Sequence, residues 1–151
     1  MTNIIEFLEI SELKETKFIH PIKVTYLQNG KSKSWEAVKS HNSVAVLLYH
    51  TQENAFLLVK QFRAPVYLND NSKTFTYELC AGLVDKEDKS LEEIVQEEID
   101  EECGYKVELN DILKITSFYT NVGISGGCQY LFFAKIDESM KIHNGGGIND
   151  E

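Results

Sequence analysis

The chain has 151 residues, enough for one compact domain with its own core, and 42% of them are hydrophobic, which argues against wholesale disorder. Its formal net charge is −9, whereas nucleic-acid-binding proteins need basic patches, so nucleic acid is excluded as a partner. If the substrate is a small anion, something local and positive must offset the repulsion.

We expect neither a membrane span nor a secretory signal. No apolar run approaches ~18 residues. The N-terminus carries acidic residues and has no basic start ahead of an apolar stretch. Cys80, Cys103 and Cys128 are widely spaced and odd in number, which predicts free thiols in a reducing cytoplasm rather than a disulfide framework or a zinc site.

A β-hairpin is predicted in the first ~40 residues. Residues 17–28 alternate and carry β-branched and aromatic side chains. The Asn29-Gly30 pair signals a tight turn, and residues 32–40 then read as the return strand. These residues form a plausible semi-separate region, although no linker marks a boundary.

Strands are also predicted in the rest of the chain. Residues 43–50 are a nearly unbroken apolar run, as expected of a strand buried on both faces, and residues 55–62 are its expected partner. Further strands are predicted at the ranges 75–80, 113–120 and 128–136, with a polar loop at 66–74 and a glycine-containing loop at 121–127.

One helix is expected from about Leu91 to Cys103. Ser90 followed by Glu93 fits a capping box at its start, and Gly104 suits the position just after its end. Successive residues turn by ~100°, which places four side chains within about 60° of one another: Leu91, Val95, Glu98 and Glu102. Ile94 and Ile99 flank this arc, and the opposite side is a solvated acidic face of Glu92, Glu93, Gln96 and Asp100.

Two carboxylates therefore lie in the middle of an apolar arc. Buried side by side, Glu98 and Glu102 would have to be protonated, paired with basic groups or neutralised by a cation. Hard oxygen ligands one turn apart suit Mg²⁺ or Mn²⁺, and Glu101 at the edge of the arc could join them or hold a metal-bound water. The alternative is a partly exposed helix edge. A site of bare carboxylates around Mg²⁺ most often handles phosphate oxygens.

The segment AGLVDKEDKSLEEIVQEEIDEECGY, residues 81–105, resembles the Nudix box. Gly82 opens the motif, and residues 98–105 supply its second half without a fault. Three departures are present. The spacing after Gly82 is one residue longer, the first glutamate falls on Asp88 or Lys89, and Glu97 replaces the arginine that helps to orient a neighbouring carboxylate in the family.

Other segments resemble the nucleoside-diphosphate-sugar branch of the family, nearest to UDP-glucose diphosphatases and ADP-ribose diphosphatases: SWEAVKSHNSVAVLLYH, LLVKQFRAPVY, YELCAGLVD and NVGISGG. The resemblance implies an α/β fold, the Nudix α/β/α sandwich with a mixed sheet. It also implies that the N-terminal β region, residues 1–40, is exchanged between two subunits of a homodimer. The Nudix domain is expected at 41–151.

The resemblance further implies the site and the reaction. Mg²⁺ or Mn²⁺ would be held by Glu98, Glu102 and the Ala81 carbonyl, with Glu101 as a further metal or catalytic residue. Water would attack the diphosphate of UDP-glucose or ADP-ribose, giving a nucleoside monophosphate and a sugar phosphate. The alternatives are an inert nucleotide-binding module on the same scaffold and, less favoured, a purely structural dimer.

Three further residues are substrate-binding candidates. Arg63 matches a phosphate-contacting position of related enzymes, with a surface ion pair as the alternative. Trp35 is the only tryptophan and could stack on the nucleobase, or pack in the core or a dimer interface. Gly82 is expected to line the site. In the family, the glycine-rich acidic loop that corresponds to residues 144–151 carries a further glutamate and continues into another strand and a final helix. We therefore expect a truncated chain in which Glu151 or Asp150 would fill the role of that glutamate.

Overall fold

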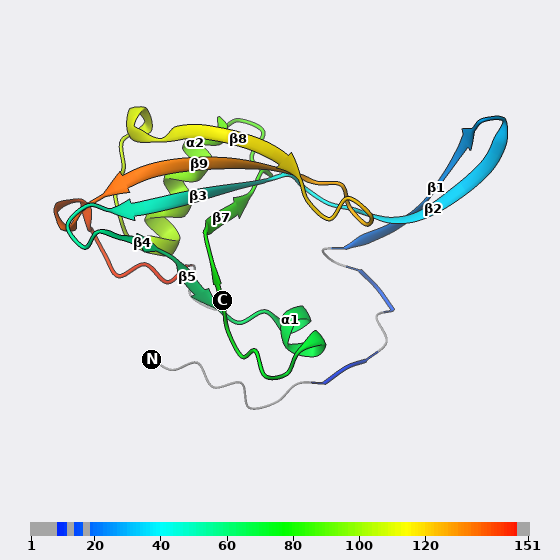
Figure 1. Ribbon diagram of the computed structural model, residues 1–151, viewed down its shortest axis with the longest axis horizontal. Coiled ribbons are helices and arrows are strands. Elements are labelled where there is room, and N and C mark those ends of the chain that lie inside the picture. The colour runs from blue at the N-terminus through cyan, green and yellow to red at the C-terminus, as the bar shows by residue number, and fades with distance from the viewer. Residues whose placement is uncertain (1–8, 12–13, 17–18, 148–151) are drawn as a thin grey trace.

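The computed structural model describes residues 9–11, 14–16 and 19–147 (Figure 1). Its strands are β1 His20–Gln28, β2 Lys31–Lys39, β3 Ser43–His50, β4 Ala55–Leu57, β5 Val59–Gln61, β6 Thr76–Glu78, β7 Cys80–Leu83, β8 Leu113–Tyr119 and β9 Cys128–Ile136. Its helices are α1 Ala64–Asn69 and α2 Leu91–Glu98, the latter continued by a π-helix at Ile99–Cys103, with 3-10 turns at Leu109–Asp111 and Glu138–Met140. Over the described ranges, no helix is long and apolar enough to cross a bilayer.

A mixed five-stranded sheet forms the body of the protein. Along one path its order is β4-β3-β9-β8, and β7 pairs with the other half of the β3 edge that β4 occupies. The β3–β9 pair is parallel, and the other pairs of this sheet are antiparallel. The predicted α/β class with a mixed sheet is therefore confirmed.

Helix α2 packs against one face of this sheet (Figure 1). Ile94 and Val95 of α2 and Ile99 of the following π-turn are at most 1% exposed, and they join a core that includes Phe132 of β9 and Leu48 of β3. Each such buried aliphatic or aromatic side chain contributes roughly 1.5–3 kcal/mol relative to full exposure. This packing fixes the side of α2 that faces β7, and hence the place of its glutamates.

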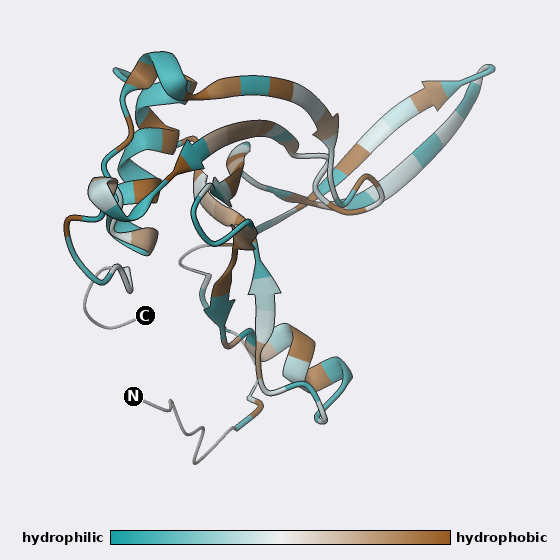
Figure 2. Cartoon of the chain, turned by 60° about the vertical axis from the view of Figure 1, so that its left-hand side comes forward, coloured by the Kyte–Doolittle hydropathy of each residue, from teal (hydrophilic) through white to brown (hydrophobic). Residues whose placement is uncertain are grey.

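The predicted hairpin is confirmed, and it projects from the body in both views (Figures 1 and 2). Asn29 and Gly30 have φ of 54° and 73°, the left-handed values that a two-residue hairpin turn requires. The hairpin is joined to the body near its base, where the Val38 N–H donates to the Ile124 carbonyl at 2.9 Å.

Three sequence predictions need correction. The strand expected at 55–62 divides at Leu58, because β4 pairs with β3 whereas β5 leaves that sheet to pair with β6. The strand expected at 75–80 is likewise two strands, and β7 returns to the central sheet. The loop expected at 66–74 is wrong at its start, where α1 begins with Pro65 in its first turn, a position that the fixed φ of proline favours.

Candidate functional site

The acidic helix begins and ends as the sequence predicts. The Ser90 hydroxyl accepts from the Glu93 N–H at 3.2 Å, and the Glu93 carboxylate accepts from the Ser90 N–H at 2.7 Å, which is the predicted capping box. Gly104 ends the helix with a φ of 76°. The last turn is π-helical, which the sequence prediction missed, and it carries Glu101 and Glu102. Such π-turns within helices occur frequently at functional sites.

Glu98 lies against the backbone of β7. A Cβ added to Gly82 would stand 1.9 Å from Glu98 Oε1, so the missing side chain of this glycine makes room for the carboxylate. Burial raises the pKa of Glu98 to about 7, and the negative charges of Glu102 and Glu101 add to the increase. The carboxylate is thus partly buried and close to other negative charges, so a bound cation would stabilise its ionised form.

Glu102 reaches the same strand one residue earlier. Its Oε2 accepts a hydrogen bond from the Ala81 N–H at 3.1 Å. Glu98 and Glu102 therefore both contact the segment Ala81-Gly82, as the predicted core-facing pair requires. Cys80 and Cys103 beside them are buried free thiols, and their mutual contact together with burial raises the pKa of Cys80 above its usual range.

Glu101 is exposed, unlike its two neighbours. In the part of the chain that the structure describes, no three Asp, Glu, His or Cys side chains are grouped so that they could hold one ion. The geometry thus brings Glu98 and Glu102 together on β7 and leaves Glu101 aside, so a direct role for Glu101 stays a prediction.

The segment after the last 3-10 turn folds onto the end of the helix. The Gly146 N–H donates to the Glu102 carbonyl at 3.0 Å, and the Gly147 N–H donates to the Glu101 carbonyl at 3.1 Å. His143 Nε2 lies 2.7 Å from Asp100 Oδ1, a contact that no sequence pattern signalled. Glu151 lies outside the described residues, so its catalytic role remains a prediction.

Sequence reasoning also missed a pair of lysines beside the glutamates. Lys86 Nζ lies 2.7 Å from Glu97 Oε2, and Lys89 Nζ contacts the other oxygen of the same carboxylate. Both lysines come from the connection between β7 and α2, eleven and eight residues before Glu97. These spacings carry no helical or strand signal, and only the tertiary fold brings the three charges together.

The two remaining substrate-binding candidates lie on other elements. Arg63 precedes α1 and makes a bidentate contact with Glu78, Nε to Oε1 at 3.0 Å and Nη2 to Oε2 at 2.9 Å, which also holds the pKa of Glu78 below its usual range. Trp35 is 55% exposed, and its indole N–H donates to the Gly123 carbonyl at 2.9 Å. That bond joins β2 to the glycine-containing loop and leaves much of the ring exposed.

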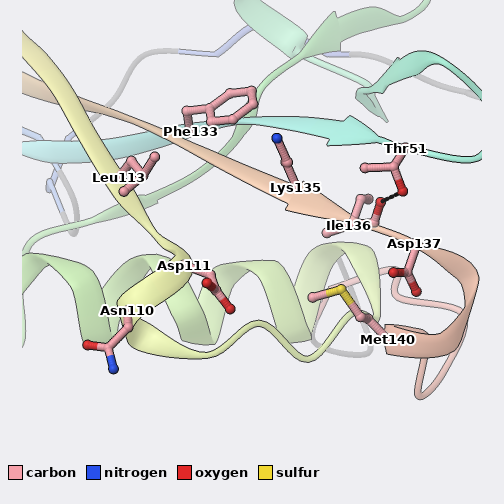
Figure 3. A pocket seen from close by; sticks show the side chains of 9 residues that line it. All are labelled: Thr51, Asn110, Asp111, Leu113, Phe133, Lys135, Ile136, Asp137 and Met140. Carbon is pink, nitrogen blue, oxygen red and sulfur yellow. Dashed lines mark hydrogen bonds between the residues drawn. The ribbon is translucent and has the colours of Figure 1, made fainter.

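A pocket of about 460 Å³ lies elsewhere, at the ends of β8 and β9 (Figure 3). Its lining combines the carboxylates of Asp111 and Asp137 with the amine of Lys135 and the side chains of Phe133 and Met140. None of the residues singled out from the sequence lines it. The candidate site is instead the open face formed by α2, the π-turn and β7.

Comparison with known proteins identifies the family. The family model of the NUDIX domain matches residues 39–150. The chain belongs to the Nudix family. Uridine diphosphate glucose pyrophosphatase of Bos taurus is 33% identical over 97% of this chain and 78% of that protein. Its Mus musculus counterpart is 30% identical, over 89% and 72%. GDP-mannose pyrophosphatase of Cronobacter sakazakii is 36% identical, over 73% and 56%.

These relatives confirm the assignment to the nucleotide-sugar branch of the Nudix hydrolases. Members of the family generally use divalent metal ions. The Nudix box of this chain could hold such an ion, because Glu98 and Glu102 present carboxylate oxygens beside the backbone of Ala81 and Gly82, and Mg²⁺ and Mn²⁺ prefer hard oxygen donors. Burial is the main cause of the raised pKa of Glu98, and a neighbouring cation would offset both that cost and the negative charges of Glu102 and Glu101 that add to it.

Proposed function

We propose that the chain is a metal-dependent hydrolase that cleaves the diphosphate of a nucleoside diphosphate sugar. The supporting observation is the convergence of Glu98 and Glu102 on Ala81-Gly82, in a protein whose relatives are named for uridine diphosphate glucose and GDP-mannose. The products would be a nucleoside monophosphate and a sugar 1-phosphate, or ribose 5-phosphate if ADP-ribose is the substrate.

The residues of the site would have different roles in the reaction. Glu98 and Glu102, with the Ala81 carbonyl, would hold Mg²⁺ or Mn²⁺. When bound, the ion would neutralise diphosphate charge and lower the pKa of the attacking water. Glu101 and Glu151 are the further candidates for the group that accepts the proton of that water. Gly82 leaves the room in which Glu98 lies, and so shapes the floor of the site.

Two residues would bind the parts of the substrate away from the attacked phosphorus. Arg63, oriented by Glu78, is proposed to contact phosphate, because a guanidinium presents paired donors to anionic oxygens. Trp35 is proposed to stack on the nucleobase, because its exposed ring is oriented by the bond to Gly123. A homodimer in the cytoplasm is the proposed form, with neither nucleic acid nor membrane as a partner.

The test is hydrolysis of three substrates by the full chain. UDP-glucose, GDP-mannose and ADP-ribose are incubated with Mg²⁺, with Mn²⁺ and with chelator, and the released monophosphate is assayed. We expect turnover that requires metal and is reduced on the order of 100-fold or more by Glu102→Gln, because the ion is worth several kcal/mol in such reactions. Glu92→Gln, the same change in the first turn of α2, is the matched control and should retain activity.

Absence of turnover with all three substrates would contradict the proposal. A thermal shift with nucleotide sugar but without turnover would point to the inert binding module instead. The ratio of kcat/KM among the three substrates would then identify the preferred base and sugar of an active enzyme.

A further inference from the structure

The π-turn that carries Glu101 and Glu102 depends on contacts from outside the helix. A π-turn is a rare conformation, and the last carbonyl groups of any helix have no partner within that helix. Here the Gly146 and Gly147 N–H groups donate to the Glu102 and Glu101 carbonyls, at 3.0 and 3.1 Å. The glycine segment, residues 144–147, therefore completes the hydrogen bonding of the turn that carries both glutamates.

Two glycines allow the glycine segment to lie backbone to backbone against the helix end. A Cβ added to Gly145 would stand 2.3 Å from the Glu102 carbonyl oxygen, and one added to Gly104 would stand 2.1 Å from the His143 carbonyl oxygen. Both glycines also have a positive φ, 64° and 76°, which other residues rarely adopt. The close fit is thus specific to these two positions.

His143 is the side chain that joins the glycine segment to the helix. Its Nδ1 accepts a hydrogen bond from the Gly145 N–H at 3.0 Å, so the ring proton lies on Nε2. Nε2 lies 2.7 Å from Asp100 Oδ1 and donates to it. Asp100 belongs to the π-turn, so one imidazole ring links the segment to the same turn whose carbonyls the segment binds.

We propose that His143 is a positioning residue of the metal site: through Asp100 it docks the glycine segment on the π-turn, and the docked segment holds Glu102 in its place beside β7. This inference rests on the metal site of the proposed function. Without the segment, the Glu101 and Glu102 carbonyls would lose these donors, and the turn would be free to relax toward an α-helix. That change alters the number of residues per turn, so it would rotate Glu102 away from Glu98.

The experiment measures metal binding to the folded protein. Mn²⁺ alone is titrated into chelator-treated protein at a temperature at which every variant is folded, and free Mn²⁺ is followed by electron paramagnetic resonance. His143→Ala should bind Mn²⁺ about tenfold more weakly, because loss of a group that orients a metal ligand typically costs roughly 10–100-fold in affinity. Its melting temperature in chelator should change little, because the two side chains are 46% and 50% exposed and such contacts add little stability. His20→Ala, at the start of β1, is the matched control and should bind Mn²⁺ as the unmodified protein does.

Two variants of Asp100 distinguish the contact from the charge. Asp100→Asn removes the charge but keeps an oxygen that accepts from His143 Nε2, so its Mn²⁺ affinity should stay within about twofold of the unmodified protein, because water screens a half-exposed charge. Asp100→Ala removes the oxygen as well and should match His143→Ala. In the metal-free protein, hydrogen exchange of the Gly146 and Gly147 amides should become at least about tenfold faster in both alanine variants, because the segment would open more often.

Unchanged Mn²⁺ affinity or unchanged amide exchange in His143→Ala would overturn the inference. Equal losses of affinity in Asp100→Asn and Asp100→Ala would overturn it as well, since charge rather than contact would then be the cause. Because the readouts are metal binding and amide exchange, a protein without turnover but with the expected response of His143→Ala would contradict the proposed function and leave this inference in place.

Discussion

Metal binding should depend on the protonation of one residue, Glu98. The pKa of Glu98 is raised from 4.5 to about 7, and a metal ligand must lose its proton. Mn²⁺ affinity should therefore rise roughly tenfold per pH unit up to about pH 7 and level off above it. Calorimetric titration between about pH 5.5 and about pH 8.5 measures this, and a flat profile would refute it.

The raised pKa of Glu98 also predicts how the stability of the metal-free protein depends on pH. A carboxyl group with a raised pKa in the fold destabilises the fold when ionised, so the cost is absent below its unfolded pKa and complete above its folded one. Glu98→Gln should then melt a few degrees higher than the unmodified protein at about pH 8, and this advantage should vanish as the pH falls to about 4.5. Thermal unfolding in chelator at both pH values gives the comparison.

A substitution at Gly82 tests the position of the Glu98 carboxylate rather than its charge. In Gly82→Ala the new methyl would overlap Glu98 Oε1 and Cδ, at 1.9 and 2.2 Å, and the flexible end of Glu98 would move instead of the backbone. We expect a nearly unchanged melting temperature and a loss of turnover of about 100-fold, because misplacement by about 1 Å can cost that much. Gly123→Ala, with no atom within 4 Å of the added Cβ, is the matched control. Full activity of Gly82→Ala would show that Glu98 need not lie there.

Among the helices and strands, the features that depend on neighbouring residues in the sequence could be predicted, and those that depend on distant strands could not. The capping box at Ser90, the C-terminal Gly104 and the Asn29-Gly30 turn are set by chemistry within a few residues, and all three were predicted. The division of 55–62 into β4 and β5 was not predictable, because it depends on which distant strand each half pairs with. The apolar residues within 55–62 are compatible with one continuous strand as well as with two separate strands.

The candidate site divides in the same way. The helical period predicts that Glu98 and Glu102 lie on one side of the acidic helix, and their contacts with Gly82 and Ala81 of β7 confirm this. The π-turn was missed, because it depends on packing at the helix end, where the Gly146 and Gly147 N–H groups bind its carbonyls. The contacts of Lys86 with Glu97 and of His143 with Asp100 were missed as well, since each joins segments that only the fold brings together.

For the whole molecule, the projecting hairpin raises the question of what covers it. Along one face of the hairpin, Ile22, Val24 and Tyr26 are 38–44% exposed, and Val24 pairs with the exposed Trp35. An isolated two-stranded hairpin is marginally stable at best in water. Burying this apolar face would stabilise the hairpin, and a second copy of the chain is the partner that the proposed homodimer provides.

A lysine placed on one face of β1 or on the other tests whether the chain dimerises through the apolar face of the hairpin. We expect the unmodified protein to sediment at about 34 kDa, twice the 17.2 kDa of one chain. Val24→Lys should shift it toward the monomer, because a charge would be buried in the apolar interface. Thr25→Lys places the same charge on the opposite face of the strand and should leave the dimer intact. Sedimentation equilibrium measures both, and a monomeric unmodified protein, or equal behaviour of the two variants, would contradict dimerisation through this face.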